Sequence, residues 1–320
     1  MLKTRVGVIR GGPGHEYEVS LKSGASVLSN LPEKYEARDI FISREGEWHL
    51  AGLTIKPEEI VRHVDVVFNA LHGEFGEDGG LQAILDNLNI PYTGSGRLAS
   101  AVGINKESVK AICRAHGIKV PYGLTLADNF DLHQASQQVF LKIPPPWVIK
   151  PLDKGSSVGL FFARSHSELE AALAKAATVS DNLLIEEYIK GKEATCGVIN
   201  NFRQERIYKL LPIEIRRPST CPVWNYEDKY SGVTEEICPG CFSAEESAEI
   251  QTIAAKMHEI LGLRHYSRSD FIVSSRGIYA LEVNTLPGLT TESLLPKALA
   301  AIGCSYADFL DHTITLALSS

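Results

Sequence analysis

The chain has 320 residues, a formal net charge of −7 and 44% hydrophobic side chains. This is enough apolar material for a large core and for more than one domain of usual size. The mild acidity argues against a nucleic-acid partner, and no apolar run approaches the roughly 18 residues that a membrane span needs.

The amino terminus, MLKTRVGVIRGGPG, enters a strand at once and lacks the apolar segment and cleavage site of a signal peptide. Six cysteines are scattered along the chain, unlike the dense pattern of a secreted disulfide scaffold. We therefore expect a cytoplasmic protein with reduced thiols. One CxxC pair, Cys238 and Cys241, leaves a redox pair or half of a zinc site as alternatives.

The first elements predict an open parallel α/β sheet. Arg5–Ile9 is an apolar strand, a glycine turn at 11–14 follows, and a helix continues through Val27. The turn is not GxGxxG, so a dinucleotide is weakly supported. Glu16 lies at the amino-terminal end of this helix, where a small charged ligand can bind.

A second buried strand, Val64–Leu71, is followed directly by His72. Open α/β sheets bind ligands at the carboxyl ends of their strands, so His72 is a candidate site residue. The acidic side chains Glu74, Glu77 and Asp78 come next. We interpret them as a solvated turn, because the spacing of a calcium loop is absent.

Further along the chain, Asn105 is expected to cap a helix over 106–116. Lys106 in the first turn opposes the helix dipole, which indicates either an anionic partner or a solvated lysine. A glycine- and serine-rich turn at 152–160 separates two predicted strands. It can fold over phosphate groups or be a plain flexible hairpin. Ser167 and Glu170 have the spacing of a capping box.

The second half of the chain begins with a strand over 183–189. Two antiparallel strands, 193–199 and 206–215, are expected to follow and to be joined across Asn200-Asn201. Residues 216–242 show no periodicity and are long for a simple connection, so we expect a lid there. A capping box opens the helix at 244–261.

The strands Arg268–Val273 and Ile278–Asn284 predict a hairpin. If its loop is 275–277, residue 274 pairs with 278, which places Asp270 opposite Glu282 and Arg268 opposite Asn284. Carboxylates and an amide oxygen suit magnesium with substrate phosphates. The alternative is an ordinary polar sheet face with a salt bridge.

The opposite face of this hairpin is expected to be apolar. It would carry Phe271, Val273, Leu281 and Val283, because strand side chains alternate. A shift of one residue in the pairing would move each side chain to the other face and remove the metal site.

Eight segments occur in one order: GGPGHEYEVSL, ALHGEFGEDGGLQ, YTGSG…NK, VIKPLDKGSSVG, IEEYIKGKEAT, YEDKY, SRSDF and LEVNTLPGLTTESL. Together they closely resemble the D-alanine–D-alanine ligases of the ATP-grasp superfamily, over nearly the whole chain. The resemblance implies a mixed α/β (α+β) ATP-grasp fold. An open parallel α/β domain (1–95) would precede a central domain (96–188) and a carboxyl-terminal domain (189–320, lid 216–242), whose two antiparallel sheets clamp ATP.

The same resemblance implies an ATP-binding set and a metal site. Lys106, Lys150 and the lid residue Lys229 would hold phosphates, Ser157 would lie in the phosphate-covering loop, and Glu186, Glu187, Ile189 and Glu193 would contact adenine and ribose. Asp270, Glu282 and Asn284 look like the ligands of two Mg²⁺ ions, with Mn²⁺ as an alternative.

The implied reaction joins two D-alanine molecules through an acyl phosphate. Glu16 would bind the ammonium of the first substrate, near His72, and would link through Ser156 to Tyr230 of the lid. Arg268 and the Gly288 N–H would form the oxyanion site, and Ser293 with Leu294 would bind the carboxylate of the second substrate. The family also implies a homodimer.

Two alternatives remain. A related ligase would take D-serine or D-lactate as its second substrate, although the lactate-specific relatives lack the lid tyrosine that this chain has at Tyr230. A binding or redox module without catalysis would use the first glycine turn or the CxxC pair. The complete set of Arg268, Asp270, Glu282 and Asn284 argues against that module.

Overall fold

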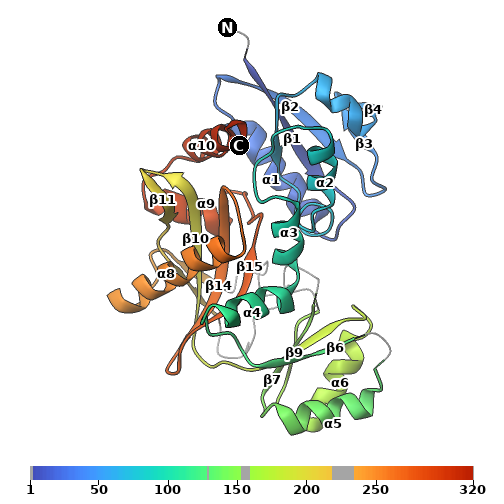
Figure 1. Cartoon of the computed structure of the whole chain (residues 1–320), viewed down its shortest axis with the longest axis vertical. Coiled ribbons are helices and arrows are strands. Elements are labelled where there is room, and N and C mark those ends of the chain that lie inside the picture. The colour runs from blue at the N-terminus through green and yellow to red at the C-terminus, as the bar shows by residue number, and fades with distance from the viewer. Residues whose placement is uncertain (1–2, 128–129, 153–158, 218–233, 320) are drawn as a thin grey trace.

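The computed structural model describes residues 3–127, 130–152, 159–217 and 234–319. Within them, the strands form three separate sheets, one after another along the chain. Along the long axis of the molecule the third sheet lies between the first and the second (Figure 1). The mixed α/β fold with several sheets is therefore confirmed.

The first sheet has the strand order β4-β3-β2-β1-β5. Its centre is parallel, since β1 pairs in parallel with both β2 and β5, and a short antiparallel hairpin forms one edge. The elements are β1 Thr4–Gly11, α1 Tyr17–Asn30, β2 Tyr35–Ile42, β3 Trp48–Leu50, β4 Leu53–Ile55, η1 Pro57–Arg62, β5 Val66–Asn69 and α2 Gly80–Asn87. This is the open α/β sheet that the glycine turn predicts.

The second sheet is antiparallel, with the order β6-β9-β7-β8. Two helices pack against it, and its core contains buried residues of both the helices and the strands. The elements are β6 Gly123–Leu126, α5 Leu132–Lys142, β7 Trp147–Pro151, β8 Phe161–Ala163, α6 His166–Ala176 and β9 Leu183–Glu187. The capping prediction for α6 is wrong: the hydroxyl of Ser165 accepts from the Glu168 N–H, two residues before the predicted pair.

The third sheet has the order β13-β12-β10-β14-β15, with β11 paired to β10. Its strands are β10 Lys192–Phe202, β11 Glu205–Lys209, β12 Ile213–Arg216, β13 Glu235–Ile237, β14 Tyr266–Ser274 and β15 Gly277–Asn284. The single predicted strand over 206–215 is thus two strands. The turn lies at Arg203-Gln204, both with positive φ, and not at Asn200-Asn201.

Helices surround this third sheet. They are α3 Arg97–Ile104, α4 Lys106–Ala115, α8 Ala244–Ile260, α9 Leu294–Ala301 and α10 Tyr306–Leu318. The predicted caps of α4 and α8 are present: Asn105 accepts from the Ser108 N–H, and Ser243 and Glu246 form a capping box. Helices α3 and α4 share the core of β14, β15 and α8, although the expected boundary at residue 96 assigns them to the central domain.

The first and third sheets share one hydrophobic core. Buried side chains of β1 and β5 lie in the same cluster as those of α9 and α10. Tyr266 of β14 and the loop residues Leu286 and Leu289 belong to it as well. Because of this shared core, the carboxyl ends of β1 and β5 lie close to the open end of the β14–β15 hairpin, where β15 ends.

The β14–β15 hairpin pairs Arg268 with Asn284 and Asp270 with Glu282, as predicted. The predicted loop is wrong: Ser274 pairs with Gly277, and only two residues turn the chain. A bulge next to Asp270 inserts one extra residue on β15 and restores the predicted pairing beyond it.

The bulge also changes which residues share the apolar face. Ile278 and Ala280 join Phe271 and Val273 in the buried core, and Leu281, predicted for that face, is the extra residue. Gly277 has φ +111°, a conformation that glycine adopts without steric cost.

Two buried histidines of the third sheet region should make folding sensitive to acid. His258 bonds to Ser267 (2.8 Å) and to Asn200 (3.1 Å), and His265 accepts from the Gly94 N–H (3.1 Å). Burial lowers the pKa of each to about 4. The unfolded chain binds protons from about pH 6.5 downwards, so stability is lost as the pH falls from about 6.5 to 4.

We expect each of these histidines to cost about 2 kcal/mol of unfolding free energy between pH 7.5 and pH 5. Urea unfolding at both pH values should show a smaller loss in the His265→Asn variant than in the unmodified protein. The exposed His133→Gln variant is the matched control and should keep the full loss. Equal losses in all three proteins would contradict this account.

No helix among the described residues is long and apolar enough to cross a membrane.

Candidate active site

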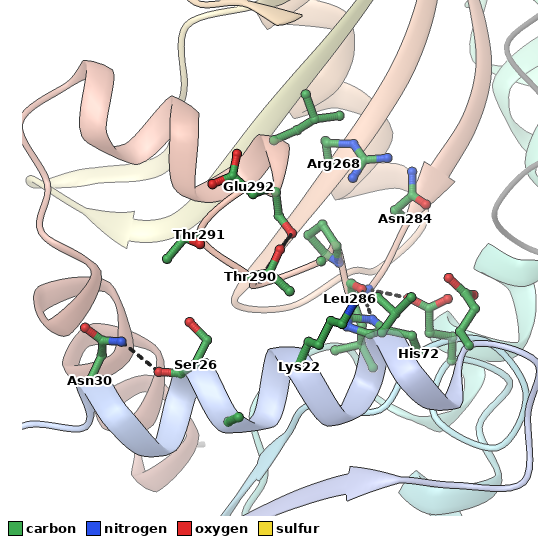
Figure 2. Close-up of a pocket in the computed structure, with 18 of the residues that line it drawn as sticks. Lys22, Ser26, Asn30, His72, Arg268, Asn284, Leu286, Thr290, Thr291 and Glu292 are labelled. Atoms are coloured by element: carbon green, nitrogen blue, oxygen red, sulfur yellow. Dashed lines mark hydrogen bonds between the residues drawn. The ribbon is translucent and has the colours of Figure 1, made fainter. Parts of the chain in front are cut away.

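A cavity of about 800 Å³ lies between the first and third sheets. Helix α1 forms one wall, and the ends of β14 and β15 with the loop that follows them form the other (Figure 2). All six residues expected to contact the amino-acid substrates line it: Glu16, His72, Arg268, Gly288, Ser293 and Leu294. These positions come from segments far apart in the sequence, and the fold brings them together.

The predicted metal face of the hairpin is a connected polar cluster. Arg268 donates twice to Asp270, through Nε at 3.1 Å and Nη2 at 3.2 Å. Asn284 Nδ2 donates to the same carboxylate at 3.1 Å, and the Thr195 hydroxyl donates at 2.5 Å. Burial alone would lower the pKa of Arg268, but the surrounding carboxylates, Asp270 foremost, raise it. Arg268 therefore stays a cation at the cavity wall.

The loop after β15 is closely packed around Gly288. A Cβ atom at this position would lie 2.8 Å from Ser293 Oγ, so only glycine leaves this approach undisturbed. The Ser293 hydroxyl bonds to the Thr290 hydroxyl (2.8 Å) and accepts from the Thr290 N–H (3.1 Å). Helix α9 begins directly after Ser293, so its amino-terminal N–H groups are available to an anion at this end of the cavity.

A buried ion cluster connects the second and third sheets. The Glu186 carboxylate lies between Lys150 Nζ (2.7 Å) and Lys110 Nζ (2.5 Å), and all three side chains are nearly inaccessible. Burial lowers the pKa of Lys110 to about 8. Burial alone would lower the pKa of Lys150, but the carboxylates of Glu186 and Glu282 raise this pKa. Glu282 is thus electrostatically linked to this cluster.

Lys110 is a residue that sequence reasoning missed. It lies one helical turn after Lys106, on the buried face of α4, and that spacing was the available signal. Lys106 is itself buried, with 7% of its surface exposed. Its backbone N–H donates to the Leu152 carbonyl at 3.2 Å, at the start of the predicted phosphate-covering turn.

The other expected nucleotide residues lie at the junction of the second and third sheets. Glu187 accepts from the Tyr122 N–H (3.1 Å) and from Arg276 of the hairpin loop (3.0 Å). Glu193 pairs with Arg217 at 2.9 Å, and Ile189 is buried. Glu187 and Glu193 both hold other protein groups here, which sequence reasoning did not foresee.

Glu77 is a second missed residue, and its interpretation as part of a solvated turn is wrong. It lines the cavity and accepts from the Gly73 N–H at 3.3 Å and from the Leu286 N–H at 3.1 Å. Burial, with a further contribution from the Glu16 carboxylate, raises the pKa of Glu77 to about 8.

Four expected site residues lie outside the described residues. They are Ser156 and Ser157 of the phosphate-covering turn and Lys229 and Tyr230 of the predicted lid.

The donor set on the hairpin suits a hard divalent cation. Two carboxylates and an amide oxygen share one sheet face, and these are ligands that Mg²⁺ accepts alongside phosphate oxygens. Among the described residues no three His, Cys, Asp or Glu side chains gather around one point. The donor types on this face fit a cation that is shared with a phosphate.

The CxxC pair has no metal-binding group around it among the described residues, and one of its thiols has a raised pKa. Within the described residues, Cys238 and Cys241 are free thiols and belong to no group of metal ligands. Burial raises the pKa of Cys238, which disfavours the reactive thiolate. We therefore expect Cys241→Ala to keep the catalytic rate within about two-fold, the usual effect of an exposed substitution. A large loss of catalytic rate in a steady-state assay would mean that the CxxC pair takes part in the function.

Comparison with known proteins gives one consistent result. The family described as "D-ala D-ala ligase C-terminus" matches residues 112–315, and "D-ala D-ala ligase N-terminus" matches 5–60 and 52–95. D-alanine–D-alanine ligases of Clostridium beijerinckii and Syntrophobacter fumaroxidans are 36% and 38% identical. The alignments cover 97% and 99% of this chain and 97% and 98% of theirs.

Solved structures agree with the sequence relatives. A D-alanine–D-alanine ligase from Bacillus anthracis complexed with ATP is similar with a TM-score of 0.81 and 30% identity, covering 99% of this chain and 98% of that one. The VanG D-Ala:D-Ser ligase from Enterococcus faecalis is similar with a TM-score of 0.87 and 30% identity, covering 99% and 100%.

Proposed function

The chain belongs to the D-alanine–D-alanine ligase family, and on that premise we propose that it joins two D-alanine molecules at the expense of ATP, for peptidoglycan precursor synthesis. The observation that carries the proposal is the cavity that combines Glu16, Arg268, Gly288 and Ser293 beside the polar hairpin face.

A carboxylate is a poor electrophile, so the first D-alanine must be activated. ATP transfers its γ-phosphoryl group to a carboxylate oxygen, and an acyl phosphate and ADP form. Glu16 at the cavity wall would bind the ammonium group of this substrate. Lys106 and Lys150, with Lys229 of the lid, would hold the phosphates, and Ser157 would belong to the loop that covers them.

The adenine and ribose would lie at the junction of the second and third sheets. Glu186, Glu187, Ile189 and Glu193 are the residues that would contact them. Lys110 and Lys150 keep Glu186 ionised: burial opposes ionisation, but the two cations lower the pKa of its carboxyl group. A carboxylate can accept a hydrogen bond from the exocyclic amine of adenine.

Asp270, Glu282 and Asn284 would hold two Mg²⁺ ions, or Mn²⁺ in their place. When bound, the ions would neutralise the charge on the phosphate groups during phosphoryl transfer. The proximity of Glu282 to the cations Lys110 and Lys150 supports a single polar site that extends from the hairpin to the nucleotide.

The second D-alanine attacks the acyl phosphate with its amine. The carbonyl oxygen becomes an oxyanion in a tetrahedral intermediate, and phosphate then leaves as the amide forms. Arg268 and the Gly288 N–H would stabilise the oxyanion. Ser293 and the Leu294 N–H, at the start of α9, would bind the carboxylate of the attacking substrate.

The proposal extends to the domains, the lid, the oligomeric state and the location of the protein. We place domain boundaries near residues 95 and 188, a lid at 216–242 closed by the Glu16–Ser156–Tyr230 link, a homodimer, and a cytoplasmic location. Since the chain is also similar to a D-Ala:D-Ser ligase, D-serine is the alternative second substrate that needs a direct test.

Phosphate release from magnesium-ATP with D-alanine, D-serine or D-lactate, together with the mass of the product, tests the proposal. We expect release with D-alanine alone and the mass of D-alanyl-D-alanine. Release that needs a second, different substrate would change the specificity and keep the mechanism. Absence of substrate-dependent release would contradict the proposed function.

A further inference from the structure

The loop that carries Gly288 is attached to the amino-terminal sheet region by its backbone. The Leu286 N–H donates to Glu77 Oε1 at 3.1 Å. The Leu286 carbonyl faces His72 Nδ1 at 3.0 Å, and a carbonyl can only accept, so Nδ1 carries the proton. Both polar backbone atoms of Leu286 are therefore held by side chains from the loop after β5.

Ser23 of α1 extends this attachment. Its hydroxyl lies 2.8 Å from His72 Nε2, and the Leu289 N–H donates to the same oxygen at 3.3 Å. Because Nδ1 of His72 is the donor to Leu286, Nε2 accepts from the Ser23 hydroxyl. Burial lowers the pKa of His72, which agrees with a neutral ring.

These three side chains hold the loop on both sides of Gly288. Leu286 and Leu289 are buried, with 3% and 1% exposed, and Ser23 is inaccessible. The loop passes close to Ser293 here, since a Cβ atom at Gly288 would lie 2.8 Å from Ser293 Oγ. Figure 2 shows His72 beside Leu286, on the α1 side of the cavity and apart from Arg268 and Asn284.

We propose that Ser23, His72 and Glu77 are positioning residues that orient the Gly288 N–H toward the oxyanion of the tetrahedral intermediate. The proposal rests on the proposed function. His72 acts through the loop backbone, because both of its ring nitrogens are bonded to protein atoms. Oxyanion donors act by being placed in advance, and a displacement of about 1 Å can cost about 10²-fold in rate.

The proposal separates the two chemical steps of the reaction. Phosphoryl transfer from ATP does not use the Gly288 N–H, whereas attack of the second amine does. Rapid-quench measurement of ADP and dipeptide in the first turnover should therefore show wild-type ADP formation in Ser23→Ala. Dipeptide formation should be slower by about 10²-fold in Ser23→Ala and in His72→Gln, with acyl phosphate accumulating in Ser23→Ala.

Two further variants, one conservative and one control, make the test more specific. In His72→Asn the side-chain amide nitrogen takes the place of Nδ1 and can still donate to the Leu286 carbonyl, so dipeptide formation should recover partly relative to His72→Gln. The exposed His133→Gln variant should match the wild type in both steps. Thermal melting of each variant identifies those that are folded, and Ser23→Ala is the smallest change should His72→Gln fail to fold.

Equal slowing of ADP and dipeptide formation, or normal dipeptide formation in folded Ser23→Ala, would overturn the positioning role. Failure of the proposed function is a different result: the wild-type chain itself would then form no dipeptide.

Discussion

Replacing Arg268 by alanine should lower turnover by about 10²–10³-fold, the usual effect of removing one oxyanion donor. Arg268 is a cation at the cavity wall with 11% of its side chain exposed, and Asp270 holds its guanidinium by two hydrogen bonds. The loss should appear in kcat more than in the KM for ATP, because the oxyanion forms only after the nucleotide has bound. Steady-state kinetics with varied ATP and D-alanine measure both values.

Arg268→Lys separates charge from geometry. It keeps the cation but loses the two parallel hydrogen bonds to Asp270, so its rate should lie between those of the wild type and the alanine variant. Arg206→Ala is the matched control, since Arg206 lies on the surface and forms an exposed ion pair with Glu259. Wild-type turnover in Arg268→Ala would remove this residue from the mechanism.

Glu282→Gln should lower kcat by about 10³-fold or more, because the Lewis-acid contribution of a metal is worth several kcal/mol. Glu282 lies opposite Asp270 on the polar hairpin face. Its neutralisation should also raise the Mg²⁺ concentration that gives half-maximal activity. Titration of activity with Mg²⁺ at saturating ATP gives both quantities.

Metal binding to Glu282→Gln can also be measured without catalysis. Mg²⁺ with ADP should raise the melting temperature of the wild type more than that of Glu282→Gln, because ligand binding stabilises the folded state by mass action. The exposed Glu205→Gln variant should behave as the wild type. An unchanged Mg²⁺ requirement in Glu282→Gln would exclude this carboxylate as a ligand.

The hairpin shows how much of the fold could be predicted from the sequence. An assumed three-residue loop at 275–277 predicted the pairing of Asp270 with Glu282, and the pairing is confirmed. The loop itself has two residues, and a bulge follows on β15. The loop is one residue shorter than predicted, and the bulge adds one residue to β15. The two differences compensate each other at Asp270, so the polar residues keep their common face, whereas Leu281 is the extra residue and does not belong to the core. A bulge has no sequence signature strong enough to be read beforehand.

Glu77 and Lys110 show what could not be predicted. Their local patterns, an acidic turn and a charged helix, are those of solvated surface. Each becomes a site residue because a distant segment covers it: the Leu286 backbone covers Glu77, and Glu186 of β9 meets Lys110. Contacts between sheets decide such burial. The spacing of Lys106 and Lys110 places both on one helix face, but it does not show which segment covers that face.

The site residues that the family resemblance implies lie in two different environments. The six expected amino-acid contacts line one cavity. Glu187 and Glu193 lie at the sheet junction but already bond protein groups, so their nucleotide roles remain predictions.

The most direct test of the central claim, carboxylate activation by phosphorylation, follows an oxygen atom. D-alanine labelled with ¹⁸O in its carboxyl group is incubated with the enzyme, ATP and Mg²⁺, and the released phosphate is analysed by mass. An acyl phosphate transfers one carboxyl oxygen to phosphate when the C–O bond breaks, so each phosphate should carry one ¹⁸O. Unlabelled phosphate would mean that water, and not the D-alanine carboxylate, accepts the phosphoryl group, and it would contradict the account.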